Sequence, residues 1–217
     1  MMKTLVAIAL TAFITPALAD DYMADLKIPE INGCKLQPKT DCRGADLSGA
    51  NLSNMDLKQA NFEGANLTGA NLSHANLRGA DLSGAQLDEV IAHRVNLYRA
   101  DVRGAKIRNA NFQGAQAEYL FAQGADFTGT DMTGANFDFS RFSGATMVDC
   151  NLNFASFEIS WMPKANLAGS NLFGANLQEA KLGHANLANA NMNGTRIHFA
   201  TFEGTFMEGC DGCPFDW

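Results

Sequence analysis

Long apolar runs are scarce in this chain of 217 residues. One run, LVAIALTAFIT, follows Lys3 and covers about 11 residues, whereas a membrane span needs about 20. Because Lys3 before this run and Ala17-Leu18-Ala19 after it are typical of a secretory leader, we expect residues 1–19 to be a cleaved signal peptide. No other stretch is apolar enough to span a membrane, so the sequence predicts an exported product that does not remain in the membrane.

The sequence also lacks helical periodicity and any interruption of its own repeat. From Thr40 to Gly209 the chain follows a five-residue period without insertion or deletion, which gives 34 pentapeptides. An α-helix would turn successive leucines of this repeat by about 140°, and a flat strand would place them on alternating faces. We therefore predict a short extended piece followed by a bend in each pentapeptide, so that four pentapeptides close one square coil.

Charged residues are missing from two of the five positions, which we number from Thr40. Position 1 is alanine in 22 of the 34 repeats, position 3 is apolar in all 34, and none of the 29 charged residues of the repeat falls on either. Because an unpaired charge is costly in an apolar interior, we expect positions 1 and 3 to point into a dry core. Of the 20 glycines, 17 occupy position 5, where a tight corner favours positive φ.

The stretch from Ala60 to Gly84 reads ANFEG ANLTG ANLSH ANLRG ADLSG. Over residues 40–209 the pattern resembles the motif A(D/N)LXX of the pentapeptide repeat family. The resemblance implies an all-β fold, a right-handed quadrilateral parallel β-helix of about 8.5 coils and roughly 40 Å length at about 4.8 Å per coil. Residues 20–39, in which Ile28-Pro29 and Asn32-Gly33 are expected to prevent regular structure, and residues 210–217 should cap the two open ends.

The five cysteines suggest how these ends are fastened. Cys34 lies eight residues before Cys42, which occupies an inward position, so we expect a disulfide that fastens the N-terminal cap in an oxidising compartment. For Cys210 and Cys213, a structural disulfide or two thiols is favoured over a redox pair, because no helix N-terminus is predicted beside them. Cys150 lies three coils from Cys210, too far for a bridge, and is expected to be a small buried apolar side chain.

Apolar and aromatic residues meet along one edge of the rod when residues four pentapeptides apart are stacked in columns. Position 5 of the fourth side and position 2 of the first side contribute six residues: Tyr119, Phe121, Phe139, Arg141, Ile159 and Trp161. An exposed apolar patch often marks a binding site, and Arg141 falls between two aromatic residues at a spacing suited to cation-π contact. Stacking of the aromatics along the rod, or cover from residues 20–39, would also explain the patch.

The sequence lacks the features of a catalytic or metal site. No inserted loop could build a cleft that excludes water, and no base, nucleophile and orienting group converge, so an enzyme is not expected. His74 and His93 could be neighbours in successive coils, but without a nearby carboxylate or thiolate they make a poor metal site. We expect no metal and no cofactor.

An exported scaffold that presents the aromatic edge to an unidentified protein partner is the function that the sequence favours. The compartment would be a bacterial periplasm, the external medium or an organelle lumen, and a rod of this kind could also form dimers. Relatives of the family that inhibit DNA gyrase by imitating duplex DNA suggest a second hypothesis. The repeat, however, has 17 acidic and 12 basic residues, a net charge of −5, against roughly 24 charges on a duplex of equal length.

Export would also separate the chain from a cytosolic topoisomerase, so no nucleic-acid partner is expected. A third hypothesis is a carbohydrate-binding β-helix in which Trp161 and Phe139 stack on sugar rings. The absence of a groove and of a carboxylate cluster in the sequence pattern speaks against this third hypothesis.

Overall fold

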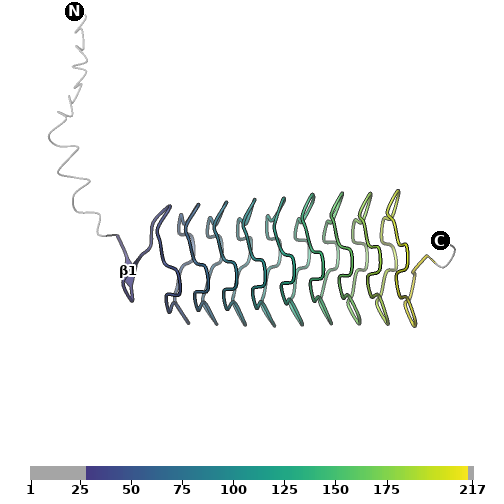
Figure 1. Ribbon diagram of the computed structural model, residues 1–217, viewed down its shortest axis with the longest axis horizontal. Coiled ribbons are helices and arrows are strands. Elements are labelled where there is room, and N and C mark those ends of the chain that lie inside the picture. The colour runs from purple at the N-terminus through teal and green to yellow at the C-terminus, as the bar shows by residue number, and fades with distance from the viewer. Residues whose placement is uncertain (1–27, 215–217) are drawn as a thin grey trace, which may run out of the picture.

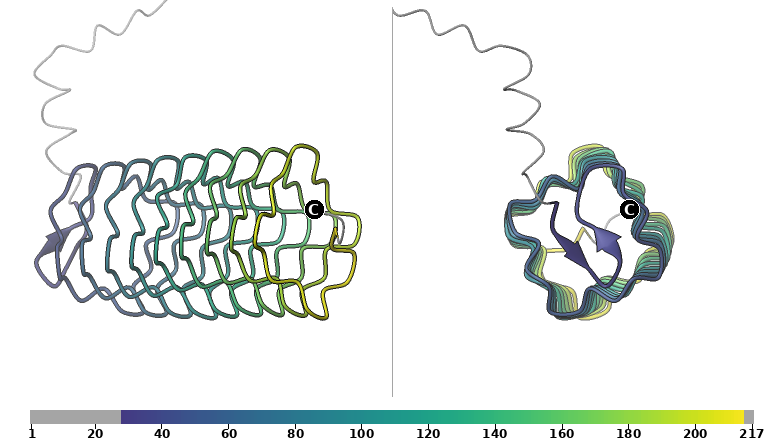
Figure 2. Two further views of the ribbon diagram at one scale, coloured as in Figure 1. Left: turned by 45° about the vertical axis from the view of Figure 1, so that its right-hand side comes forward. Right: turned by 90° about the vertical axis from the view of Figure 1, so that its left-hand side faces the viewer.

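The computed structural model describes residues 28–214, and they form a right-handed, four-sided parallel β-helix (Figures 1 and 2). Each bridge joins a residue to its counterpart four pentapeptides later, all along the rod, from Asp41 with Asn61 to Asn191 with Asp211. The end-on view in Figure 2 shows the coils superposed as a nearly square outline. The predicted coil of four pentapeptides is confirmed. Within residues 28–214, no helix has the length and hydropathy that a membrane span needs.

Most pentapeptides between the two end coils are held by the same backbone hydrogen bonds. The N–H of position 2 donates to the preceding coil, the N–H groups of positions 3 and 5 donate to the following coil, and the N–H of position 1 closes the corner. The side chain at position 2 adds a local bond, as where Asn61 Oδ1 accepts from the Glu63 N–H at 3.0 Å. Such bonds stabilise turns and explain why position 2 is so often asparagine or aspartate. Position 5 has positive φ at every corner, as predicted.

Positions 1 and 3 form one continuous apolar core along the rod. Its bulkiest part is a cluster of phenylalanines around Phe142, which is 0% exposed and contacts the rings of Phe127, Phe137 and Phe157 at centroid distances of 5.9, 5.4 and 5.6 Å. Edge-on and tilted aromatic pairs of this kind stabilise the fold by more than the burial of their apolar surface alone.

Hydroxyl groups at position 1 are accommodated by a repeated backbone contact. The Ser140 hydroxyl donates to the Ala117 carbonyl at 2.9 Å, and the Ser160 hydroxyl donates to the Phe137 carbonyl at 2.8 Å. Because these buried hydroxyls are hydrogen-bonded, they do not carry the cost of an unpaired polar group. Cys150 takes the equivalent position, is buried as predicted, and is free of any disulfide.

The N-terminal end is covered by a two-stranded antiparallel hairpin. Strands β1 (Glu30–Ile31) and β2 (Cys34–Lys35) pair across the Asn32-Gly33 turn, and Figure 2 shows the hairpin lying over the open end. The expectation that Asn32-Gly33 prevents regular structure was wrong, because both residues adopt positive φ and close a tight hairpin. The disulfide between Cys34 and Cys42, with Cα atoms 5.2 Å apart, joins the hairpin to the first coil.

The C-terminal end is closed by a second disulfide, between Cys210 and Cys213, whose Cα atoms are 5.7 Å apart. The coil ladder continues through Asp211, just beyond the last pentapeptide. The predicted signal peptide, the first part of the N-terminal cap and residues 215–217 lie outside the described residues.

Candidate interaction surface

The predicted aromatic edge begins on the fourth corner, which we define as positions 4 and 5 of the fourth side. The rings of Tyr119 and Phe139 stack in successive coils, with centroids 4.9 Å apart and planes 8° apart. Their side chains are 39% and 41% exposed, and Ile159 in the next coil is 41% exposed. Stacking along the rod therefore occurs, yet it leaves a large apolar surface in contact with solvent.

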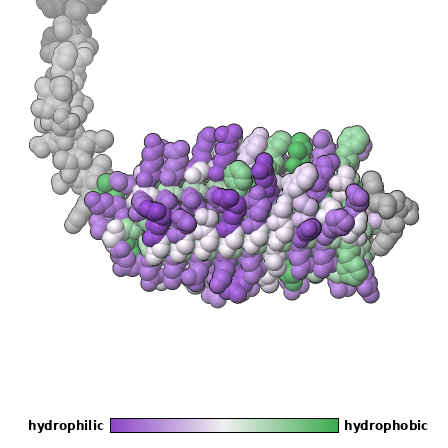
Figure 3. Space-filling view, in the orientation of Figure 1, coloured by the Kyte–Doolittle hydropathy of each residue, from purple (hydrophilic) through white to green (hydrophobic). Residues whose placement is uncertain are grey.

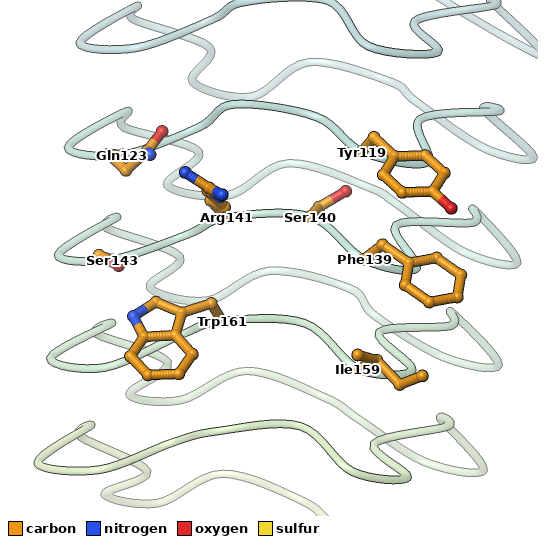
Figure 4. Close-up of a pocket in the computed structure, with 8 residues that line it drawn as sticks. All are labelled: Tyr119, Gln123, Phe139, Ser140, Arg141, Ser143, Ile159 and Trp161. Carbon is orange, nitrogen blue, oxygen red and sulfur yellow. The ribbon is translucent and has the colours of Figure 1, made fainter.

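The other half of the edge lies around the corner, at position 2 of the first side. Phe121, Arg141 and Trp161 occupy successive coils, and parallel β-bridges join Phe121 to Arg141 and Arg141 to Trp161. The Arg141 guanidinium lies over the Phe121 ring at 5.6 Å and points toward the coil of Gln123 (Figure 4). As predicted, Arg141 lies between Phe121 and Trp161 in successive coils. Within residues 28–214, however, its cation-π contact is with Phe121 alone. Trp161 is left 54% exposed.

A hollow of about 550 Å³ lies between the two halves of the edge. Its lining residues, shown in Figure 4, are Tyr119, Gln123, Phe139, Ser140, Arg141, Ser143, Ile159 and Trp161. The Ser140 hydroxyl is already engaged, since it donates to the Ala117 carbonyl and accepts from the Leu120 N–H. Gln123 Oε1, in contrast, is buried and has no hydrogen-bond partner among the described residues.

Five of the six predicted edge residues thus line one hollow, and Phe121 lies outside it beneath Arg141. Gln123, Ser140 and Ser143 were missed, although Gln123 and Ser143 lie only two residues after Phe121 and Arg141 on the first side. Figure 3 shows hydrophobic side chains on the C-terminal half of a largely hydrophilic surface. The structure therefore gathers most of the predicted residues around one hollow on the surface of the rod.

The sequence prediction also missed a cationic extension of the edge toward the N-terminus. Arg78 lies over the Tyr98 ring at 4.7 Å, and Arg99 lies over both Tyr98 at 5.3 Å and Tyr119 at 5.5 Å. A second hollow, of about 370 Å³, is lined by Lys58, Gln59, Arg78, Gly79 and Arg99. Because Arg99 contacts Tyr119, the cationic and aromatic parts form one continuous strip of surface. Arg78 and Tyr98 occupy position 4 of the fourth side in successive coils, and Arg99 occupies position 5, so the sequence contains the signal for this extension.

The residue type at position 5 sets the fourth corner apart from the first. On the first corner, position 5 is glycine in six successive coils, from residue 44 to residue 144. On the fourth corner the same left-handed conformation is taken by Arg99, Tyr119, Phe139 and Ile159, with φ between 56° and 61°. This conformation costs about 1 to 2 kcal/mol for a residue with a Cβ, and it is least favourable for a β-branched side chain such as Ile159. Non-glycine residues on the other corners, such as Glu89 and Arg94, adopt the same conformation, so it belongs to the coil and does not by itself mark this surface.

His74 and His93 lie on the third corner. His74 and His93 line a third hollow, of about 490 Å³, and within residues 28–214 no group of three or more histidine, cysteine or acidic side chains is suited to a metal ion. Near this hollow, the pKa of Asp131 lies below its usual value: burial acts to raise it, but hydrogen bonds from Thr133 and Gln113 and the charge of His93 outweigh burial. The carboxylate is therefore already satisfied by protein groups.

Some solved structures of other proteins have a similar architecture. No curated protein matches the chain. Among solved structures, it is similar to HetL from the cyanobacterium Nostoc sp. strain PCC 7120, described as involved in heterocyst differentiation regulation, with 28% identity, coverage of 78% of this chain and 79% of HetL, and a TM-score of 0.59.

A second solved structure shares the fold. It is QnrB1, a plasmid-mediated fluoroquinolone resistance protein, with 20% identity, coverage of 77% of this chain and 88% of that chain, and a TM-score of 0.53. The family model described as pentapeptide repeats matches eight copies, over residues 38–64, 56–91, 75–114, 110–149, 150–183 and 170–209. Since these matches cover most of the sequence, the chain belongs to the pentapeptide repeat family.

Proposed function

We propose that the chain is an exported, non-catalytic scaffold that binds a protein partner through the edge formed by Tyr119, Phe139, Ile159, Arg141 and Trp161. The observation that carries the proposal is the open hollow between these side chains, among which Phe139, Ile159 and Trp161 are 41%, 41% and 54% exposed. Tyrosine, tryptophan, phenylalanine and arginine are the residues most enriched at the centres of protein interfaces.

The rigidity of the rod supports the same proposal. All coils are joined by an uninterrupted hydrogen-bond ladder, so the edge is held in place before a partner arrives. A surface that is already ordered loses little conformational entropy on binding.

Site-specific photocrosslinking in the producing cell tests the proposal. A photoreactive amino acid placed at position 139 or 161 should yield covalent protein adducts, whereas the same probe at position 89, an exposed site on the second corner, should not. Mass spectrometry then identifies the captured chain. If positions 139 and 161 give no more adduct than position 89, the edge is not the interface.

Export is tested separately from binding. Mass spectrometry of the protein recovered from the exported fraction should give a mature N-terminus at Asp20. Recovery of the uncleaved chain in the cytosol would overturn the exported part of the proposal and leave the binding part to be judged by crosslinking.

A further inference from the structure

Charges on the fourth corner are separated by sign along the rod. From residue 38 to residue 179, this corner carries four cations followed by four anions: Lys39, Lys58, Arg78, Arg99, Glu118, Asp138, Glu158 and Glu179. On the first corner, in contrast, charges of both signs are interspersed, as in Arg43, Glu63, Arg103, Lys164 and Glu203. The fourth corner therefore has one cationic half and one anionic half, which the first corner lacks.

Most of these charges have no ion-pair partner within residues 28–214. The exception is Lys58, whose Nζ lies 3.0 Å from Asp56 Oδ2. The carboxylates of Glu118, Asp138 and Glu158 accept hydrogen bonds from neutral side chains or the backbone, which fixes their positions but leaves their charge uncompensated. Since successive coils lie about 4.8 Å apart, like charges in each half repel one another unless an oppositely charged surface covers them.

We propose that this surface is covered by a second copy of the chain, packed antiparallel on the fourth corner. A two-fold axis perpendicular to the rod, between the coils of Tyr98 and Glu118, reverses the order of the coils and keeps each column opposite itself. Arg78 of one protomer then lies opposite Asp138 of its partner, and Lys58 opposite Glu158. Because the axis is two-fold, each of these contacts occurs twice.

The remaining positions match under the same operation. Lys39 lies opposite Glu179, the Tyr98 hydroxyl opposite the Glu118 carboxylate, and Arg99 opposite the Tyr119 ring. No two like charges meet at any of the eight levels. A parallel pairing about an axis along the rod would instead place each charge opposite its own copy or a near neighbour of the same sign, so the charges select the antiparallel arrangement.

The shapes of the two facing surfaces also fit the antiparallel arrangement. Phe139, 41% exposed, lies opposite Gly79, which lines the hollow of about 370 Å³ and has no side chain to obstruct the ring. Ile159 lies opposite Gln59, in the same hollow. The strip is about 34 Å long but only one corner wide, which places it at the small end of specific interfaces and gives a reversible dimer.

This inference rests on the proposed function, since it names the protein that the Tyr119, Phe139 and Ile159 part of the edge binds. It adds a specific register, which charge reversal can test. R78D places a carboxylate opposite Asp138, and D138R places a guanidinium opposite Arg78; both act twice in a homodimer. When the two variants are mixed, a heterodimer regains an opposite charge at both contacts.

Sedimentation velocity of the purified protein over roughly 1 to 300 micromolar, a range suited to a small interface, provides the test. We expect a concentration-dependent dimer in the unaltered chain, a rise in Kd of about 100-fold in R78D or D138R alone, and recovery to within about 10-fold in the equimolar mixture. R94D, the same change on the third corner, should leave Kd unaltered. Higher salt should weaken the dimer of the unaltered chain.

The recovery in the mixture also shows that each variant is folded. A monomer at every concentration, or two weakened variants whose mixture stays monomeric, would refute the antiparallel dimer. If crosslinking from position 139 captures a different protein and never this chain, the dimer is refuted while the proposed scaffold function stands. If crosslinking captures nothing and the chain is monomeric, both fail.

Discussion

Because the thiol of Cys150 is buried, we expect the free energy of unfolding of the rod to fall at alkaline pH. Its Sγ lies in the core, donates to the Phe127 carbonyl at 3.0 Å and is 2% exposed as a residue. Burial raises the pKa of the Cys150 thiol from 9.0 to about 12, although hydrogen bonds from the Thr130 and Gly129 backbone act in the opposite direction. The folded state therefore keeps the proton at a pH where the unfolded chain has lost it.

The sign and size of the effect follow from proton linkage. Below pH 8 both states are protonated and the thiol contributes no pH dependence. Between pH 9 and pH 12 the folded state binds more protons than the unfolded state, so stability falls as pH rises. With these pKa values, the free energy of unfolding should fall by about 1.4 kcal/mol at pH 10 and by about 2.6 kcal/mol at pH 11, relative to pH 8.

Urea unfolding of the unaltered chain and of Cys150→Ala, each at pH 7, 8, 9 and 10, isolates this contribution. All other side chains are the same in the two proteins, so the difference between their free energies of unfolding reports the thiol alone. We expect the difference between the two free energies of unfolding to be constant up to pH 8 and to be smaller by about 1.4 kcal/mol at pH 10. A difference that stays constant from pH 7 to pH 10 would show that the thiol is not buried as described and would refute the reasoning.

Three further predictions concern the fold. Phe142→Ala should lower the free energy of unfolding by about 3 to 5 kcal/mol because it opens a cavity among the core phenylalanines, whereas Phe142→Leu should cost less than about 1.5 kcal/mol, both measured by urea unfolding. Gly84 has φ +64° and open space where a Cβ would lie, so Gly84→Val should cost about 2 kcal/mol from backbone strain alone and Gly84→Asn close to nothing; equal costs would contradict the left-handed corner. Replacing Cys34 and Cys42 by serine should cost up to about 2.5 kcal/mol and speed amide exchange in β1 and β2, while unchanged exchange would show that the disulfide does not hold the hairpin.

The coil could be predicted from the sequence because the repeat has one solution that buries positions 1 and 3 together. The same regularity predicted which side chains lie in successive coils, and it brought Tyr119 next to Phe139. It did so because every coil consists of four pentapeptides and no insertion displaces a column. Where the period ends, prediction failed: strands as short as β1 and β2 leave no periodic signal, and the hairpin at Asn32-Gly33 was read as irregular.

The direction of the side chains at the corners could not be predicted from the sequence either. A column places Arg141 between Phe121 and Trp161, but the choice between them depends on rotamers of a long side chain, which the sequence does not specify. Arg78 and Arg99 were overlooked because their contacts with Tyr98 join position 4 of one coil to position 4 of a neighbouring coil or position 5 of the same coil. The hollow beside Gln123 likewise depends on how several neighbouring side chains turn.

The unbroken register has a consequence for how this rod can change in length. Adding a single pentapeptide would turn everything after it by a quarter turn and would move the acidic half of the fourth corner onto a different edge from the cationic half. Adding four pentapeptides would restore every later residue to its original edge and move it only one coil along the axis. Duplications and deletions of whole coils are therefore the changes that this surface tolerates, whereas shorter ones would divide it.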